Sequence, residues 1–319
     1  MTNKKGFIHS VIPYIQIARP DHWFKNVFMI PGVVFALYDA PSLLSLHILF
    51  PLLIALIATC LIASSNYTIN EILDAPKDCF HPIKKNRPIP SGKVNVTIAY
   101  IQWIVLAVLG LAIGWQLNSF FFYSLLFLLI MGFLYNIPPV RLKDIPYLDV
   151  LSEAINNSIR LCLGWFAVND QYPPTLSLVM AYWMIGAFFM AIKRFAEYKR
   201  IGDPAVAASY RKSFAYYNEY RLILSIVYYA SAFSFFFGIF IARYRLELVL
   251  SIPFLAGFIP LYMRMGFWAD SPAQYPEKLY KVKGLMLYTS FCFLVLIALL
   301  FVDVPFLEKL LTPAHIPGK

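Results

Sequence analysis

The chain has 319 residues, of which 60% are hydrophobic, 17% are aromatic and only 14% are charged. Soluble domains carry about a quarter charged residues, so this composition excludes an ordinary soluble domain. The formal net charge is +10, but the basic residues alternate with long apolar runs, as in loops held at an anionic membrane surface. The charge therefore indicates membrane lipids as partners and argues against nucleic acid.

Apolar runs recur along the whole chain, and crossing a bilayer takes about 20 helical residues. The runs lack the period-2 alternation of barrel strands, and backbone polar groups in lipid need internal partners, so the runs are predicted to be helices. The predicted fold class is all-α, a polytopic membrane protein forming a single integral membrane domain over 1–319. Nine spans are expected, at 24–39, 43–69, 96–115, 119–136, 147–168, 175–192, 221–242, 246–266 and 285–302.

The distribution of Lys and Arg predicts the orientation of the chain. Nearly all basic residues lie in the N-terminal segment and in the loops at about 70–95, 136–147, 193–220 and 267–284. The opposite side holds only Arg243, Arg245, Lys309 and Lys319. The bias predicts a multi-pass protein of the cell inner (plasma) membrane, with its N-terminus and active site facing the cytoplasm.

The cysteines and the N-terminal residues add little to the prediction of function. The four cysteines are scattered and form no CxxC pair, so neither a disulfide framework nor a zinc site is indicated. The first 20 residues hold no long apolar core, and no cleavable signal peptide is expected.

An acidic cluster follows the second predicted span. Glu71, Asp74 and Asp78 would lie on one helical face, directly after Asn70. Carboxylates so close together repel each other and favour a counter-ion, and oxygen ligands completed by water and phosphate suit Mg²⁺. Pro76 could kink or end the helix before Asp78. The alternative is a solvated helix end whose acids pair with Lys77, Lys84 or Lys85.

A basic, proline-rich loop at 81–89 comes next and contains Lys84 and Arg87. Acids that hold metal beside bases that hold oxyanions would suit a pyrophosphate–Mg²⁺ complex. The same loop could instead serve only to fix the orientation of the chain in the membrane.

A second cluster surrounds the fifth predicted span and comprises Tyr135, Arg141, Lys143, Asp144, Asp149, Glu153 and Arg160. Asp149 and Glu153 are four residues apart and share a helical face. Arg160 lies about three turns further along, where ionisable groups are costly and usually functional. A buried structural ion pair is the alternative.

Two further segments carry candidate substrate-binding residues. Lys193 and Arg194, at the end of the sixth span, would grip a phosphate or form a polybasic belt at the lipid headgroups. Trp23 and Lys25 lie at the start of the first span, and nothing in that segment alone separates membrane anchoring from substrate binding.

Together these residues resemble the UbiA superfamily of intramembrane prenyltransferases, which has nine helices and the motifs NDxxDxxxD and DxxxD. The first motif is present as Asn70, Glu71, Asp74 and Asp78, and the second as Asp149 and Glu153. Each has one Glu in place of Asp.

Within the superfamily, the segments 19–26, 81–89 and 193–197, and Asp149 followed by Arg160, are similar to the enzymes that make phosphoribosylated lipid. The resemblance implies Mg²⁺-dependent transfer of 5-phosphoribose from phosphoribosyl pyrophosphate to a polyprenyl phosphate, with release of pyrophosphate. The implied metal ligands are Glu71, Asp74, Asp78, Asp149 and Glu153, of which Asp74, Asp78 and Asp149 are catalytic. The implied substrate-binding residues are Asn70, Lys25, Lys84, Arg87, Tyr135, Lys143, Arg160, Lys193 and Arg194.

Two alternatives stay open. The same fold could move a prenyl group from a prenyl pyrophosphate to an aromatic or other acceptor, since both donors present pyrophosphate to the same acids. A transporter using the intramembrane charges belongs to another class. The scarcity of charge on one side argues against such a path.

Overall fold

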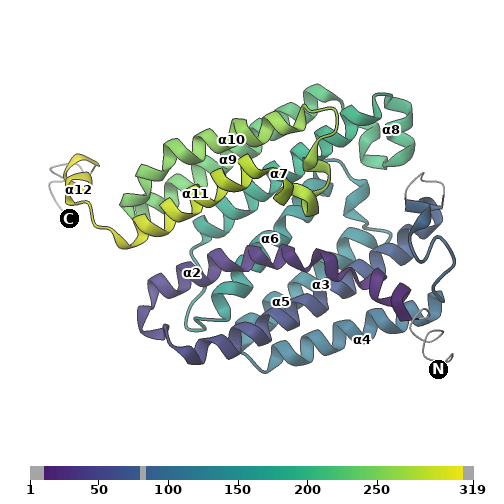
Figure 1. Ribbon diagram of the computed structural model, residues 1–319, viewed down its shortest axis with the longest axis horizontal. Helices are drawn as coiled ribbons and strands as arrows, with labels where there is room; N and C mark the ends of the chain where they lie inside the picture. The colour runs from purple at the N-terminus through teal and green to yellow at the C-terminus, as the bar shows by residue number, and fades with distance from the viewer. Residues whose placement is uncertain (1–10, 80–83, 312–319) are drawn as a thin grey trace. The chain divides into compact units, whose positions relative to one another are not determined.

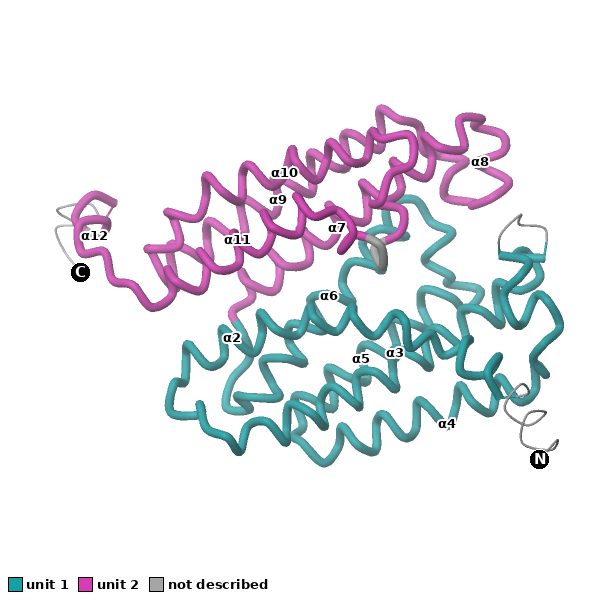
Figure 2. The backbone as a smooth tube through the Cα atoms, in the orientation of Figure 1, with its two compact units in different colours: residues 1–174 teal, residues 175–319 magenta. Residues whose placement is uncertain are grey.

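A computed structural model describes residues 11–79 and 84–311, except the side chains of residues 276–278 and 308. Within these ranges every regular element is a helix, as predicted (Figure 1). The chain divides into two compact units, Met1–Pro174 and Thr175–Lys319 (Figure 2). The expectation of a single membrane domain stays a prediction.

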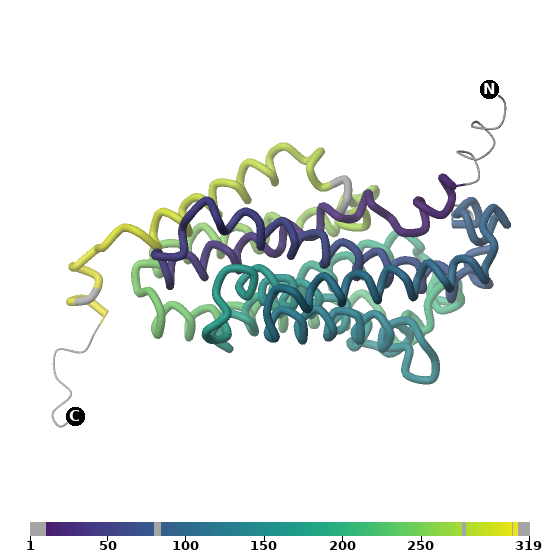
Figure 3. The backbone as a smooth tube through the Cα atoms, turned by 90° about the horizontal axis from the view of Figure 1, so that it is seen from below, coloured from purple at the N-terminus to yellow at the C-terminus, as the bar shows by residue number. Residues whose placement is uncertain are grey.

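Residues 11–18 of the first unit are helical. The elements that follow are η1 (Pro20–Met29), α2 (Ile30–Asp39), η2 (Pro41–Leu43), η3 (Leu46–Ile48), α3 (Leu49–Asp78), η4 (Lys84–Asn86), α4 (Val96–Trp115), α5 (Ser119–Asn136), η5 (Leu142–Asp144) and α6 (Leu148–Phe166). Helix α3 packs against α4 and α5, and α6 packs against α2 and α5. These long helices run lengthwise beside one another in both views (Figures 1 and 3).

The second unit contains α7 (Leu176–Ile201), α8 (Pro204–Tyr210), η6 (Lys212–Ala215), α9 (Glu219–Tyr244), η7 (Leu246–Ser251), α10 (Ile252–Gly266), η8 (Pro272–Gln274), η9 (Pro276–Lys281), α11 (Lys283–Phe301) and α12 (Pro305–Leu311). Its principal packing is between α7 and α9.

Seven helices in the described ranges are long and apolar enough to span a membrane. They are Leu46–Asp78, Val96–Trp115, Ser119–Asn136, Leu176–Ile201, Glu219–Tyr244, Leu246–Gly266 and Lys283–Phe301. The expected count of nine is not confirmed. The predicted span at 24–39 divides into a 3₁₀ segment and the ten-residue α2, and the one at 147–168 is α6, which carries Asp149, Glu153 and Arg160.

Helix α3 extends nine residues beyond the predicted end of the second span and includes Pro76. A proline removes one hydrogen bond and clashes with the preceding turn. Because Pro76 lies in the last turn, the helix continues to Asp78, and Cys79 N–H donates to the Ala75 carbonyl oxygen at 3.1 Å. The acids therefore stay on one helix.

Two glycines allow α2 and α6 to approach closely. A Cβ atom on Gly32 would overlap the Leu161 carbonyl oxygen, and one on Gly164 would overlap the Met29 carbonyl oxygen. Small residues at a helix crossing let two backbones pack directly in a membrane protein. This crossing fixes the end of η1 beside the last two turns of α6.

A small apolar core holds the ends of several segments together beside the acids. It joins the N-terminal helix, the end of α3, the loop after η4 and the start of α4. Its buried residues are Ile17, Ile69, Ile72, Ile89, Val94 and Ala99. Burial of these side chains stabilises the position of a loop that would otherwise be held only by polar contacts.

Candidate active site

Asp74 is held by two cations from the segment between α5 and α6. Its Oδ1 accepts hydrogen bonds from Lys143 Nζ at 2.6 Å and from an Arg141 terminal nitrogen at 2.7 Å. The charge of Lys84 also acts on this carboxylate. Charge-assisted bonds of this length are among the stronger contacts in proteins, so the end of α3 is tied to the start of α6.

Asn136, the last residue of α5, extends the same network. Its Oδ1 accepts from Asn70 Nδ2 at 2.6 Å and from Lys143 Nζ at 2.9 Å, and its own amide donates to the Gly132 carbonyl. Asn70 Nδ2 also lies 3.3 Å from Asp74 Oδ2. Asn70 therefore contacts Asp74, and its substrate-binding role stays a prediction. The sequence alone does not single out Asn136 as a site residue.

Asp78 pairs with the basic loop. Arg87 donates to Asp78 Oδ2 at 2.6 Å, and the Asp78 side chain is largely buried. The predicted proximity of the acids to the proline-rich loop is present for Arg87 and Lys84, whereas residues 81–83 lie outside the described residues.

Glu71 has different surroundings from Asp74. It is 1% exposed, its Oε1 accepts from the Ile89 backbone N–H at 3.3 Å, and its Oε2 lies 3.7 Å from an Arg19 terminal nitrogen. These partners belong to the loop after η4 and to the residue before η1. The metal role predicted for Glu71 stays a prediction, and these contacts also give the residue a part in positioning two segments.

Tyr135 and Lys143 connect the second acidic motif with the first. Tyr135 OH donates to Glu153 Oε2 at 3.3 Å, and Lys143 Nζ lies 5.8 Å from the centre of the Tyr135 ring. Lys143 thus connects Asp74 on α3 with a tyrosine that contacts Glu153 on α6. Asp149, in the first turn of α6, is fully buried.

Arg160 lies in the interior, three turns along α6. Its Nε donates to Asn26 Oδ1 at 2.9 Å and a terminal nitrogen donates to the Asn156 carbonyl at 3.1 Å. Asn26 Nδ2 in turn contacts Cys60 Sγ at 3.1 Å. Because a buried guanidinium needs polar partners, this arrangement explains how α6 carries an arginine inside the bundle.

The predicted basic pair of the second unit lies at the end of α7. Arg194 is 1% exposed and lies 3.5 Å from Glu197 Oε2, while Tyr210 OH donates to Glu197 Oε1 at 2.9 Å. Burial and then the charge of Glu197 raise the pKa of Tyr210. Lys193 precedes this cluster on α7 and is half-buried. Glu197 and Tyr210 connect α7 with α8.

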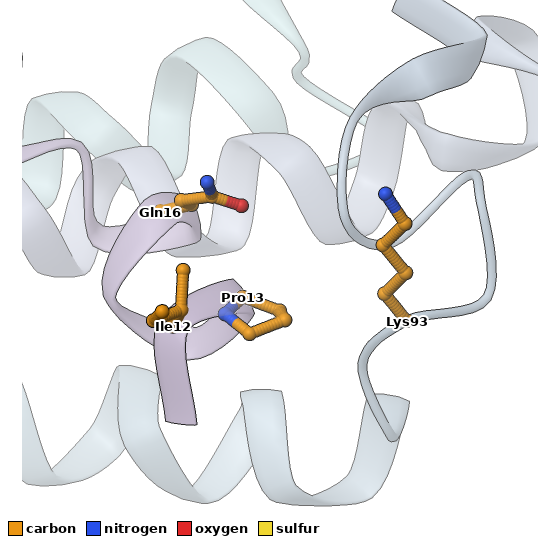
Figure 4. Close-up of a pocket in the computed structure, with 4 residues that line it drawn as sticks. All are labelled: Ile12, Pro13, Gln16 and Lys93. Atoms are coloured by element: carbon orange, nitrogen blue, oxygen red, sulfur yellow. The ribbon is translucent and has the colours of Figure 1, made fainter. Parts of the chain in front are cut away.

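An open cavity is lined by four residues outside these groups. Ile12, Pro13, Gln16 and Lys93 line it (Figure 4). None of the four is a predicted site residue, and Lys93 is the one charged group among them.

The donor set of α3 and α6 fits Mg²⁺. In the described part of the chain no three His, Cys, Asp or Glu side chains form a ready cluster. Mg²⁺ is usually held by one or two carboxylates together with water and substrate phosphates, and Asp74 with Asp78, or Asp149 with Glu153, offer such a pair. Their oxygen ligands match a hard cation.

A helical membrane bundle with two acidic motifs joined by cations defines the class of the protein, and comparison with known proteins gives the family. Residues 28–291 match the UbiA prenyltransferase family. The chain belongs to that family and is a multi-pass membrane protein.

Among curated relatives, the decaprenyl-phosphate phosphoribosyltransferase of Mycolicibacterium smegmatis is 30% identical over 184 residues, covering 57% of this chain and 56% of that protein. The protoheme IX farnesyltransferase of Flavobacterium psychrophilum is 30% identical over 155 residues, covering 47% of this chain and 50% of the relative. The chain thus spans about half the length of the curated relatives it matches.

The fold is also that of solved UbiA structures. A UbiA homologue from Archaeoglobus fulgidus bound to DMAPP and Mg²⁺ aligns with a TM-score of 0.68 at 19% identity, covering 89% of this chain and 98% of that one. A homologue from Aeropyrum pernix aligns with a TM-score of 0.57 at 16% identity, covering 85% and 97% of the two chains.

Proposed function

We propose that this protein transfers 5-phosphoribose from phosphoribosyl pyrophosphate to a polyprenyl phosphate and releases pyrophosphate, with Mg²⁺ as cofactor. The observation that carries the proposal is the Asp74–Lys143–Tyr135–Glu153 connection, which gathers both acidic motifs and several cations at one end of the first unit. The similarity to phosphoribosyltransferases of decaprenyl phosphate supports this choice of substrates.

In the proposed reaction, the C1–O bond between ribose and pyrophosphate breaks while an acceptor phosphate oxygen forms a new bond to C1. The leaving group takes the electron pair of the broken bond, so negative charge grows on pyrophosphate and positive charge grows on ribose. Groups placed in advance to offset that charge lower the barrier. The acceptor phosphate is already ionised, and no strong general base is needed.

The proposed roles follow the donor chemistry of each group. Asp74, Asp78, Asp149 and Glu153 would hold Mg²⁺, which when bound offsets charge on the pyrophosphate. Asn70, Tyr135 and Lys143 would orient the donor, and Lys84 and Arg87 would bind its phosphates. Arg160, Lys193 and Arg194 stay predicted substrate-binding residues. We further propose that this site faces the cytoplasm at the inner membrane.

A second candidate is transfer of a prenyl group from a prenyl pyrophosphate. It is favoured by the homologues bound to DMAPP or GPP with Mg²⁺ and by the similarity to a protoheme IX farnesyltransferase. The acids would serve either donor. The acceptor and a direct assay therefore distinguish phosphoribosyl transfer from prenyl transfer.

The test is an incubation of the purified protein in lipid nanodiscs with radiolabelled phosphoribosyl pyrophosphate, a polyprenyl phosphate and Mg²⁺. Labelled lipid is expected only when all three are present. A parallel incubation uses labelled geranylgeranyl pyrophosphate with aromatic acceptors. If labelled product forms only in the second incubation, the proposal of phosphoribosyl transfer is wrong and prenyl transfer takes its place.

A further inference from the structure

Helix η1 places three basic residues in a row. It is a 3₁₀ helix over Pro20–Met29, opened by Arg19 with φ 49°. Side chains three residues apart eclipse one another in a 3₁₀ helix, so His22 and Lys25 share one side, and His22 N–H donates to the Arg19 carbonyl at 2.9 Å. The spacing at 19, 22 and 25 thus becomes a spatial row.

The row surrounds one aromatic side chain of α3. The Tyr67 ring centre lies 5.9 Å from the Arg19 guanidinium carbon, 5.6 Å from Lys25 Nζ and 5.1 Å from the His22 ring centre. Trp23 Nε1 donates to Ser64 Oγ at 2.9 Å and fixes η1 on α3. Cation–π contacts hold the basic groups without neutralising their charge.

Negative charge is scarce in this cluster. Arg19 has Glu71 at 3.7 Å, and His22 has the exposed Asp21 at 3.0 Å. No acid among the described residues forms an ion pair with Lys25, whose contact is the Tyr67 ring. Burial, followed by the charges of Lys25 and Arg19, lowers the pKa of His22 to about 4. A bound anion would offset the positive charges of Lys25 and Arg19.

The surroundings of the cluster are apolar on the exposed side. Trp23, Phe24 and Val27 of η1 are 41%, 44% and 52% exposed. In a membrane protein such exposed side chains are expected at the lipid, with tryptophan at the level of the headgroups. An anion bound here would therefore meet lipid beside its charged group, which favours a phosphate that carries an apolar chain.

The position on α3 relates the cluster to the acids. Tyr67, Glu71, Asp74 and Asp78 are separated by four, three and four residues, so they lie along one face of the helix. Seven residues of α-helix rise about 10 Å, which puts the Tyr67 cluster roughly that far along α3 from Asp74. The cluster thus lies beside the acidic motif and meets it at the Arg19–Glu71 contact.

We propose that Arg19, His22 and Lys25, arranged around Tyr67, bind the phosphate group of the polyprenyl phosphate acceptor, whose chain extends along the exposed apolar side of η1. The identity of the acceptor rests on the proposed function. The subsite itself rests on the geometry of η1 and Tyr67. In this arrangement the acceptor phosphate binds beside η1, whereas the carboxylates of Asp74 and Asp78 would serve the donor.

The experiment measures binding without donor and without metal. Full-length protein in nanodiscs of neutral lipid is titrated with geranylgeranyl phosphate, and separately with geranylgeraniol and with inorganic phosphate. Nanodiscs containing phosphatidylglycerol test whether ordinary anionic headgroups compete. The variants are Lys25→Met, which removes the charge, Lys25→Arg, which keeps it, and Lys93→Met, which removes an exposed lysine outside the cluster.

Lys25→Met is expected to weaken binding of geranylgeranyl phosphate about tenfold or more, because a charge-assisted contact is lost. Lys25→Arg and Lys93→Met are expected to bind as the wild type does, and geranylgeraniol should bind weakly to all. Lys25→Gln replaces Lys25→Met if the latter does not purify as a folded protein.

Equal affinities of Lys25→Met and Lys93→Met would overturn the subsite. So would competition by inorganic phosphate or phosphatidylglycerol at concentrations comparable to geranylgeranyl phosphate. The proposed function fails in a different way, when the wild type binds the lipid phosphate normally but no labelled phosphoribosyl lipid forms. Absence of lipid-phosphate binding by the wild type would overturn both.

Discussion

Lys143 Nζ lies 2.6 Å from Asp74 Oδ1 and joins the segment before α6 to the end of α3. The same ammonium group donates to Asn136 Oδ1 at the end of α5. A single lysine therefore fixes three helix ends around the first acidic motif. Because the Lys143 side chain is 8% exposed, loss of its partner leaves a charge with little access to water.

Asp74→Asn is expected to lower the Mg²⁺-dependent turnover about 100-fold or more, as loss of one charge-stabilising group does in other active sites. It should also lower Tm, because Lys143 then keeps a poorly compensated charge. The double variant Asp74→Asn/Lys143→Met should recover Tm but not turnover. Nanodisc assays and thermal unfolding measure the two effects, and unchanged turnover in Asp74→Asn would remove this residue from the catalytic set.

Glu71→Gln tests whether Glu71 holds metal or positions the chain. Its contacts with Ile89 and Arg19 predict that the Mg²⁺ concentration for half-maximal turnover stays at the wild-type value, while the loop after η4 becomes more sensitive to proteolysis. Asp78→Asn should instead raise the Mg²⁺ requirement. A matching rise in Glu71→Gln would support the metal role that the sequence predicts for this residue.

Gly164→Ala is expected to lower Tm by about 5 °C, because the added methyl group overlaps the Met29 carbonyl and overpacking costs a few kcal/mol. Gly238→Ala is the matched control, since no atom lies within 4 Å of a Cβ at that position. Alanine favours helix over glycine, so the control should be neutral or slightly stabilising. Similar losses in both variants would contradict the close α2–α6 crossing.

The stability of the protein is expected to fall on acidification partly through His22. Its pKa in the folded protein is about 4, below the ordinary value of about 6.5. Between these values the unfolded chain binds a proton that the folded protein does not, so stability is lost as pH falls from about 6.5 towards about 4.

The groups that face His22 are Arg19, Asp21, Lys25 and Tyr67. Other carboxyl groups titrate in the same range, so the measurement is the difference between wild type and His22→Gln. Thermal unfolding across this pH range should show a shallower loss in the variant. Identical pH profiles would show that the imidazole has its ordinary pKa in the folded protein.

Several features of the fold could be predicted from the sequence because they depend only on residues close together in the chain. Long apolar runs indicated helices, and seven described helices meet the requirements for a membrane span. The spacing of Glu71, Asp74 and Asp78 placed them on one helical face, and α3 confirms that they share a helix. The two predicted spans that did not meet these requirements carry charged or 3₁₀ segments, whose cost in lipid depends on partners elsewhere.

The sequence by itself determined the all-helical class, the multi-pass character and the residues of the two acidic motifs, since hydrophobicity and helical periodicity are local properties. Only the tertiary structure decided which cation meets which acid, that Glu71 is buried against Arg19, and that Arg19, His22 and Lys25 surround Tyr67. These contacts join segments up to about 70 residues apart in the chain. Their formation follows from packing, as at the Gly32–Gly164 crossing, and composition and spacing do not contain that information.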